Sequence, residues 1–129
     1  MKTVLIIEDD QIILDMYRDK FEVSNFGVIT ALNGEDGLAA ALAHRPNLIL
    51  LDLAMPKMDG MTMMRKLREN VWGSTVPIII LTNLNLDGKM LEEIIKLKPT
   101  YSLMKTNTTP EEVLEKVKEI LSMEGGEKE

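Results

Sequence analysis

The chain has 129 residues, of which 45% are hydrophobic and 28% charged, a composition ordinary for one globular domain. It has no cysteine, which excludes disulfides and thiolate-bound metal ions. Its formal net charge of −6 argues against a nucleic-acid partner, because binding to a phosphate backbone depends on clustered lysine and arginine.

The first residues, Met1-Lys2-Thr3-Val4, lead into an apolar run without the layout of a signal peptide. No apolar run in the chain approaches the length that is needed to span a bilayer. We therefore expect a cytoplasmic protein that has no membrane partner.

Short apolar segments predict the strands of a sheet, and segments of helical periodicity separate them. The apolar segments are mostly continuous rather than alternating, which is typical of strands that are covered on both faces. In chain order they are Thr3–Ile7, Val28–Ala31, Leu48–Leu51, Ile78–Leu81 and Tyr101–Met104. Repeated strand-helix units of this kind predict an α/β fold, a doubly wound parallel sheet with helices on both faces.

Apolar residues three or four positions apart predict a helix in each interval. The stripes are Ile13, Tyr17 and Phe21, then Leu38 and Leu42, then Met64, Leu67 and Val71, and then Met90, Leu91, Ile94 and Ile95. The last helix has a capping box, Thr109-Pro110-Glu111-Glu112, with proline at its first position. We expect one domain over residues 1–122 and a polar, disordered tail over residues 123–129.

Polar side chains follow the predicted strands at the point where each strand ends. Glu8 and Asp9 follow the first strand, Asp52 the third, Thr82 the fourth, and Lys105 the fifth. Because the carboxyl ends of parallel strands meet at one edge of a sheet, where such folds bind ligands, these groups are expected to share a site. A carboxylate placed at the end of the most apolar strand is costly unless it is paired or bound to a cation.

The types of residue at this edge indicate phosphate chemistry. Glu8, Asp9 and Asp52 would repel one another until a cation binds, and hard oxygen ligands favour Mg²⁺. A lysine and a hydroxyl group, here Lys105 and Thr82, are groups that hold phosphoryl oxygens. An aspartate carboxylate is an established nucleophile in phosphoryl transfer, so Asp52 could accept a phosphoryl group.

Four segments together resemble the receiver domain of the two-component response regulators, over residues 1 to about 122; they read "VLIIEDD", "LILLDLAMPKMDG", "VPIIILTN" and "LMKT". The resemblance implies the CheY-like, flavodoxin-like fold, with five parallel strands in the order 2-1-3-4-5. It implies that Asp52 is phosphorylated. It also implies that Asp9, Asp52 and the backbone carbonyl of Ala54 bind Mg²⁺, with Glu8 acting mainly through water.

The resemblance assigns Thr82 a hydrogen bond to the phosphoryl group and Lys105 an ion pair with it. It implies a sensor histidine kinase or a phosphotransfer protein as the donor, and a downstream output protein as the partner. No output domain follows the receiver pattern, so we expect a stand-alone regulator of the chemotaxis type, a monomer or weak dimer. Such a protein is not an enzyme on external substrates; it catalyses only its own phosphorylation and dephosphorylation.

The chain departs from the family pattern at three places. Thr106 follows Lys105 where the family usually has proline, and we expect a trans peptide there because a non-proline cis bond costs ~3 kcal/mol. Asn83 stands at a position that is usually small. Ser102 occupies the position of the family's aromatic switch, and Tyr101, one residue earlier, is expected to point to the other face unless a bulge shifts the register.

Two alternatives remain open. A phosphatase of the haloacid-dehalogenase type also forms an aspartyl phosphate, but it usually carries a second aspartate two residues after the nucleophile, where this chain has Ala54. A degenerate receiver would act as a binding module without phosphorylation.

The resemblance also links the water that hydrolyses the aspartyl phosphate to the side chains two places after Asp52 and two places after Thr82. These are Ala54 and Leu84, which cannot bind water, so we expect slow dephosphorylation.

Overall fold

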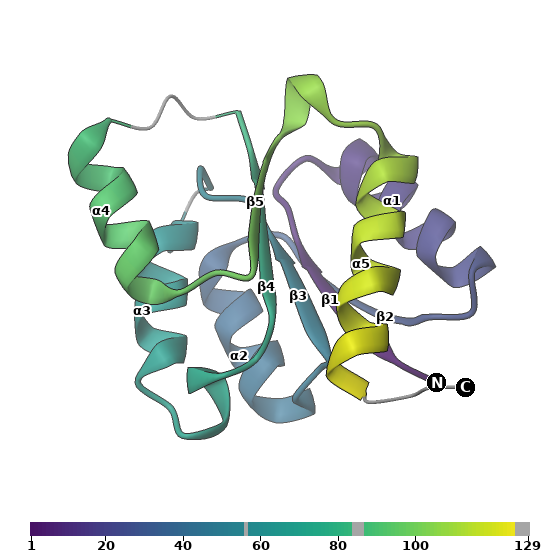
Figure 1. The fold of residues 1–129 in the computed structure, drawn as a ribbon, viewed down its shortest axis with the longest axis horizontal. Helices are drawn as coiled ribbons and strands as arrows, with labels where there is room; N and C mark the ends of the chain where they lie inside the picture. Colours follow the sequence, from purple (N-terminus) through teal and green to yellow (C-terminus); the bar gives the residue numbers. More distant parts are fainter. Residues whose placement is uncertain (56, 84–86, 126–129) are drawn as a thin grey trace.

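The computed structural model describes residues 1–55, 57–83 and 87–125. Figure 1 shows one parallel sheet of five strands in the order β2-β1-β3-β4-β5. The strands are β1 (Thr3–Ile7), β2 (Gly27–Ala31), β3 (Leu48–Leu51), β4 (Ile78–Thr82) and β5 (Tyr101–Met104). The predicted fold class and strand order are confirmed, and the predicted strand bounds are met to within one residue.

Helices connect the strands and end the chain. They are α1 (Gln11–Val23), α2 (Gly34–His44), α3 (Gly60–Arg68), α4 (Gly88–Leu97) and α5 (Pro110–Gly125), with short 3-10 turns η1 (Trp72–Ser74) and η2 (Lys105–Asn107). Within the described residues, no helix combines the length and the apolar character that crossing a membrane requires.

Helix starts follow the capping signals in the sequence. The Asp10 side chain accepts from the amides of Ile12 and Ile13 and begins α1. Thr109 and Glu112 exchange side chain-to-backbone hydrogen bonds of 2.8 and 3.2 Å, which is the predicted capping box of α5. That helix continues to Gly125, so it includes the first residues of the expected tail. Residues 126–129 and Leu84 lie outside the described part of the chain.

The third predicted helix is shorter than its apolar stripe suggested. The spacing of apolar residues predicted that Val71 lies on the same stripe as Met64 and Leu67. The helix instead ends at Arg68, and Val71 is 91% exposed. The amides of Glu69 and Asn70 return to the carbonyls of Lys66 and Leu67 in a terminal turn. This turn takes the chain off the helical path before Val71 could reach the core.

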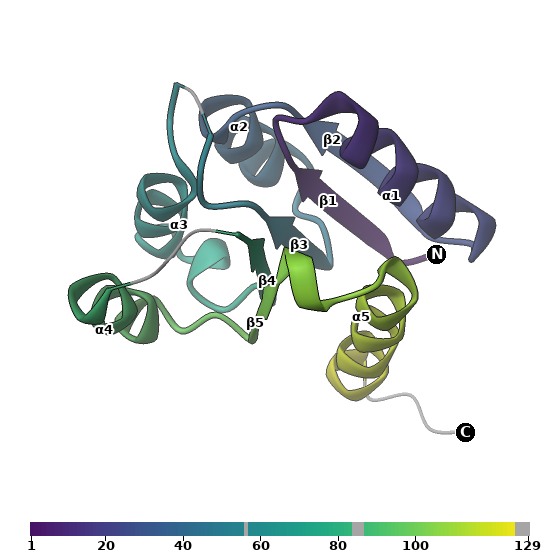
Figure 2. The same cartoon turned by 90° about the horizontal axis from the view of Figure 1, so that it is seen from above.

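The core lies in two layers, one on each face of the sheet. Successive residues of β1 alternate between them, with Val4 and Ile6 in one layer and Leu5 and Ile7 in the other. Helices α1 and α5 cover the first layer, and α2, α3 and α4 cover the second (Figure 2). This two-sided burial explains why the strands are continuously apolar, and it leaves polar side chains to the strand ends.

Candidate functional site

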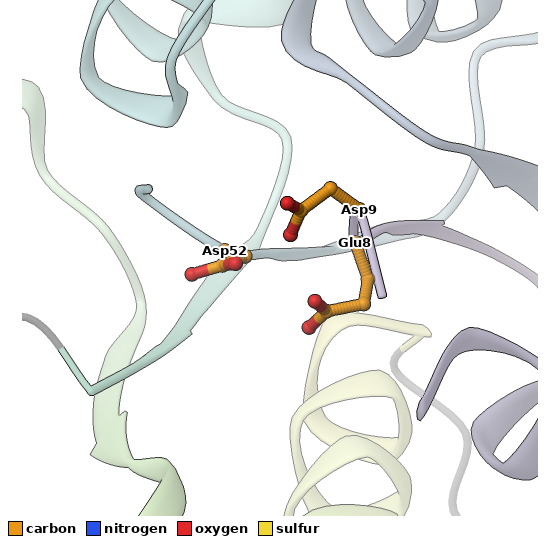
Figure 3. A group of neighbouring side chains, drawn as sticks. All are labelled: Glu8, Asp9 and Asp52. Atoms are coloured by element: carbon orange, nitrogen blue, oxygen red, sulfur yellow. The ribbon is translucent and has the colours of Figure 1, made fainter. Parts of the chain in front are cut away.

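Three of the predicted carboxylates converge at the carboxyl edge of the sheet. Glu8 and Asp9 directly follow β1, and Asp52 directly follows β3 (Figure 3). One oxygen atom from each carboxylate lies within 4.8 Å of the others. The convergence has a simple origin, because β1 and β3 are adjacent in register and Ile7 pairs with Leu51.

The backbone holds these residues at fixed positions. The Asp52 amide donates to the Ile7 carbonyl at 3.1 Å, and the Glu8 amide donates to the Ala31 carbonyl at 3.0 Å. Glu8 and Asp52 are only 4% and 5% exposed, whereas Asp9 is exposed. The site therefore pairs two buried carboxylates with one that faces solvent.

Lys105, the first residue of η2, extends its ammonium group to the two buried carboxylates. Its Nζ lies 2.8 Å from Glu8 Oε1 and 3.5 Å from Asp52 Oδ2. Burial raises the pKa of the Glu8 carboxyl, and the charge of Asp52 adds to this, although Lys105 and the Asp10 amide oppose it. Burial alone would lower the pKa of Lys105, but its hydrogen bond to Glu8 and the charges of Asp52 and Glu8 raise it.

Thr82 is the last residue of β4 and is buried. Because β4 lies between β3 and β5, Thr82 ends the strand that separates Asp52 from Lys105. Asn83 follows directly and is exposed. The sheet order thus brings every predicted strand-end residue to the same edge.

Ala54 lies in the segment between β3 and α3. Its amide is 3.4 Å from Asp52 Oδ1. The Gly60 amide donates to the Leu53 carbonyl at 2.8 Å, so the two ends of this segment are held together. A second contact was not predicted from the sequence: the Gly34 amide donates to the Met58 carbonyl at 2.9 Å.

The donor set fits a divalent cation. Three carboxylates and one ammonium group leave two uncompensated negative charges, which one Mg²⁺ would balance. The donors are oxygens, which suit Mg²⁺ better than softer metal ions. Glu8, Asp9, Asp52 and the carbonyl of Ala54 are the groups that could hold the ion, directly or through water.

The backbone conformation answers the questions raised by the other two departures from the family pattern, at Thr106 and at Ser102. No cis peptide occurs in the described residues, so the Lys105–Thr106 bond is trans, as expected. The pairing of β5 with β4 continues without a bulge from Tyr101 to Met104, and Ser102 lies opposite Ile80. Tyr101 accordingly faces α5, where Lys116 Nζ lies 4.2 Å from the centre of its ring. Ser102 takes the opposite face, toward α4.

Comparisons with known proteins show which family the chain is similar to. The family described as the response regulator receiver domain matches residues 4–118. The polar-differentiation response regulator DivK of Brucella anthropi is 32% identical over 87 residues, which cover 67% of this chain and 71% of DivK. The DNA-binding dual master transcriptional regulator RpaA of Synechocystis is 38% identical over 84 residues, 65% of this chain but only 35% of RpaA.

A solved structure extends the likeness to the whole fold. The CheY-like response regulator receiver domain protein of Methanospirillum hungatei superposes with a TM-score of 0.88 at 26% identity, and the match covers 99% of each chain. The chain spans about a third of the length of RpaA. The functions that RpaA performs through the rest of its length are therefore not attributed to this chain.

Proposed function

Because the chain belongs to the response regulator receiver domain family, we propose that it accepts a phosphoryl group on Asp52 and passes the signal to a partner protein. The observation that carries the proposal is the buried Asp52 carboxylate, which lies within 4.8 Å of Glu8 and Asp9 oxygens and 3.5 Å from Lys105 Nζ. A carboxylate in this setting lies beside other oxygen donors for a metal ion and close to a cation that can hold a phosphoryl oxygen.

The chemistry is a transfer between two nucleophiles. An Asp52 oxygen attacks phosphorus, the phosphorus–nitrogen bond of a donor phosphohistidine breaks, and its electron pair stays on the imidazole. Lys105 leaves its contacts with Glu8 and Asp52 to pair with a phosphoryl oxygen, and Thr82 donates to another. When it is bound, Mg²⁺ supplies positive charge that offsets the charge of the phosphoryl oxygens.

The donor in this proposal is a sensor histidine kinase or a phosphotransfer protein, and the receiver of the signal is a separate output protein. The phosphorylated unit is the domain over residues 1–122, acting in the cytoplasm as a monomer or weak dimer. The protein turns over only its own aspartyl phosphate. Ala54, which stands where haloacid-dehalogenase phosphatases usually carry a second aspartate, supports this assignment over that of a phosphatase.

Intact-mass measurement after incubation with a small acyl phosphate tests the proposal. Wild type should gain one phosphoryl group in Mg²⁺ and none in chelator, whereas Asp52→Asn should gain none. Asp59→Asn is a matched control, because Asp59 is nearby but caps α3 through the Thr62 amide. Equal incorporation into wild type and Asp52→Asn, or incorporation that chelator does not affect, would overturn the assignment of Asp52.

We also propose that the phosphorylated state is long-lived, because the Ala54 side chain cannot align a water for attack on phosphorus. Changing Ala54 to Asn and Leu84 to Glu should speed hydrolysis about tenfold, equivalent to about 1.4 kcal/mol of barrier. Phosphate loss in excess Mg²⁺ after removal of the donor measures this rate. Decay of the wild type as fast as that of the double variant contradicts the proposal.

A further inference from the structure

One residue of the segment between β3 and α3, Lys57, has a backbone conformation that its residue type does not favour. Lys57 has a φ of 62°, in the left-handed region that residues with a side chain seldom adopt. Such a conformation persists only where surrounding contacts hold it. Lys57 lies three residues after Ala54 in the same segment, so contacts that hold the backbone at Lys57 bear on the position of Ala54.

One of these contacts comes from outside the segment. Gly34 is the first residue of α2, and its amide donates to the Met58 carbonyl at 2.9 Å. A Cβ at Gly34 would lie 2.0 Å from the Met58 carbonyl oxygen and 2.8 Å from its carbon. Both atoms belong to the backbone, so a side chain at position 34 could be accommodated only if the backbone moved at Met58 or at the start of α2.

The start of α2 is itself firmly placed. Asn33 is 6% exposed, and its Oδ1 accepts from the Asp36 amide at 2.8 Å. Its Nδ2 also donates to Asp36 Oδ2 at 3.1 Å. Gly34 is thus presented to Met58 by a capped helix end rather than by a loose loop.

We propose that Gly34 is a positioning residue for the metal site: its contact with Met58 sets the path of the segment that carries Ala54. The inference rests on the proposed function, in which the Ala54 carbonyl helps to hold Mg²⁺ together with Asp9 and Asp52. Groups that orient metal ligands without touching the ion commonly change metal affinity when they are altered. Gly34 acts in this way through backbone contact.

Three glycine-to-alanine variants separate this role from a general loss of stability. Gly34→Ala places a Cβ 2.0 Å from the Met58 carbonyl oxygen and so clashes with the contact that the wild type makes there. Gly88→Ala changes the first residue of α4, which follows the capping residue Asp87 as Gly34 follows Asn33, but its Cβ would meet nothing within 4 Å. Gly73→Ala places a Cβ 2.3 Å from the Leu67 carbonyl oxygen, a backbone clash of the same kind. Gly73 lies in η1, beyond the C-terminal end of α3, whereas the site precedes the start of that helix.

The measurement is Mg²⁺ affinity by calorimetric titration, with thermal melts in chelator for the same proteins. Gly34→Ala should bind Mg²⁺ about tenfold more weakly than wild type, in the range seen when groups behind metal ligands are changed. Gly88→Ala and Gly73→Ala should keep the wild-type affinity, although Gly73→Ala should melt at a lower temperature. Equal affinity in Gly34→Ala and wild type, or an equal loss in Gly73→Ala, would overturn the inference.

A second measurement needs no variant, so it holds even if Gly34→Ala does not fold. Coupling between two sites is reciprocal, so Mg²⁺ must stabilise the Gly34–Met58 contact if that contact favours Mg²⁺ binding. Amide hydrogen exchange at Gly34 should slow in saturating Mg²⁺ by a larger factor than at Gly37, whose amide donates to Asn33 in the same helix. Exchange at Gly34 that Mg²⁺ leaves unchanged refutes the inference. If wild type binds no Mg²⁺ at all, the proposed function fails as well, and the two failures are distinguished.

Discussion

Two partly buried cations lie at opposite edges of the sheet, and they are neutralised in different ways. At the carboxyl edge, Lys105 contacts two carboxylates, Glu8 and Asp52, within a cluster that carries more negative charge than it can balance. At the amino edge, Arg68 at the end of α3 donates to backbone carbonyls and to no carboxylate within the described residues. The carboxyl edge keeps net negative charge that a bound cation could neutralise, whereas the charge of Arg68 at the amino edge is already met by backbone carbonyls.

The contacts of Arg68 join four parts of the chain. Its guanidinium group reaches the carbonyls of Leu97 and Lys98 at the end of α4, Gly73 in η1, and Val76 before β4, at 2.7 to 2.9 Å. Burial lowers the pKa of Arg68, yet arginine remains charged at any physiological pH. The carbonyls at a helix end carry partial negative charge, which suits a fixed cation. The fold is thus stabilised by Arg68 at the amino edge, while net negative charge for binding a cation is kept at the carboxyl edge.

The largest effect is expected from breaking the amino edge. Arg68→Met removes four hydrogen bonds and leaves their carbonyls without that donor, so it should lower the free energy of unfolding by about 4 kcal/mol. Urea unfolding measures the loss, which should be the same with and without Mg²⁺. Arg65→Met on the same helix is the control, because Arg65 pairs with Glu93 at the surface, where a single ion pair contributes at most ~1 kcal/mol. A Mg²⁺-dependent loss in Arg68→Met would contradict the separation of the two edges.

Breaking the carboxyl edge should cost less and should depend on the metal. Lys105→Met leaves Glu8 and Asp52 without their shared cation, and we expect a loss of about 3 kcal/mol in chelator. Mg²⁺ should recover most of this loss and should bind more tightly, because no ammonium group competes for the carboxylates. Lys116→Met, which removes a half-buried lysine of α5 that contacts Tyr101 rather than the cluster, is the control. If Mg²⁺ recovers nothing in Lys105→Met, the cluster is not a metal site.

Alkaline titration should reveal a buried tyrosine, Tyr17, whose ionisation destabilises the fold. Burial, together with the charges of Glu8 and Glu111, raises the pKa of Tyr17 to about 12 from 10.0. Because the folded protein holds this proton more tightly, the stabilisation is complete below pH 10 and is lost as the pH rises through 12. The loss should be on the order of 2 kcal/mol.

Unfolding free energies measured across this pH range check the effect. Tyr17→Phe should lose less stability than wild type, whereas Tyr101→Phe, which changes an exposed tyrosine, should follow wild type. Parallel curves for wild type and Tyr17→Phe would show that the phenol is not responsible.

The smallest effect concerns the exposed member of the cluster. Asp9→Asn removes one negative charge beside Glu8 and Asp52, so in chelator it should stabilise the fold, by less than ~1 kcal/mol. The same change should remove the stabilisation that Mg²⁺ gives to wild type. Thermal melts with and without Mg²⁺ measure both effects. A lower melting temperature for Asp9→Asn in chelator would mean that repulsion does not dominate the site.

The strands and the strand-end residues could be predicted because each depends on local pattern and on one rule of topology. Leu48–Leu51 is apolar because both faces of β3 are covered, and Asp52 stands out at its end. The contacts of Arg68 and of Gly34 could not be predicted in this way. Each joins a side chain or an amide to backbone carbonyls in other elements. Every residue type has a backbone carbonyl, so the residue types do not indicate which carbonyl is contacted.

The sequence still held a partial signal for one of these contacts. Asn33-Gly34 begins α2 with a residue that weakens a helix, a choice that is explained only by the nearby Met58 carbonyl. The error at Val71 has a related cause. Its spacing matched the stripe of α3, but periodicity does not reveal where a helix ends when no capping residue marks the end.

The position of η1 gives the molecule an optical property. Trp72, the single tryptophan of the chain, lies in this turn beside Gly73, whose carbonyl receives Arg68, and it packs against the core on the α2–α4 face. Its emission is therefore a native probe of the amino edge and of global unfolding. Ion binding at the carboxyl edge should leave the tryptophan emission nearly unchanged. One unlabelled sample can therefore report unfolding separately from occupancy of the site.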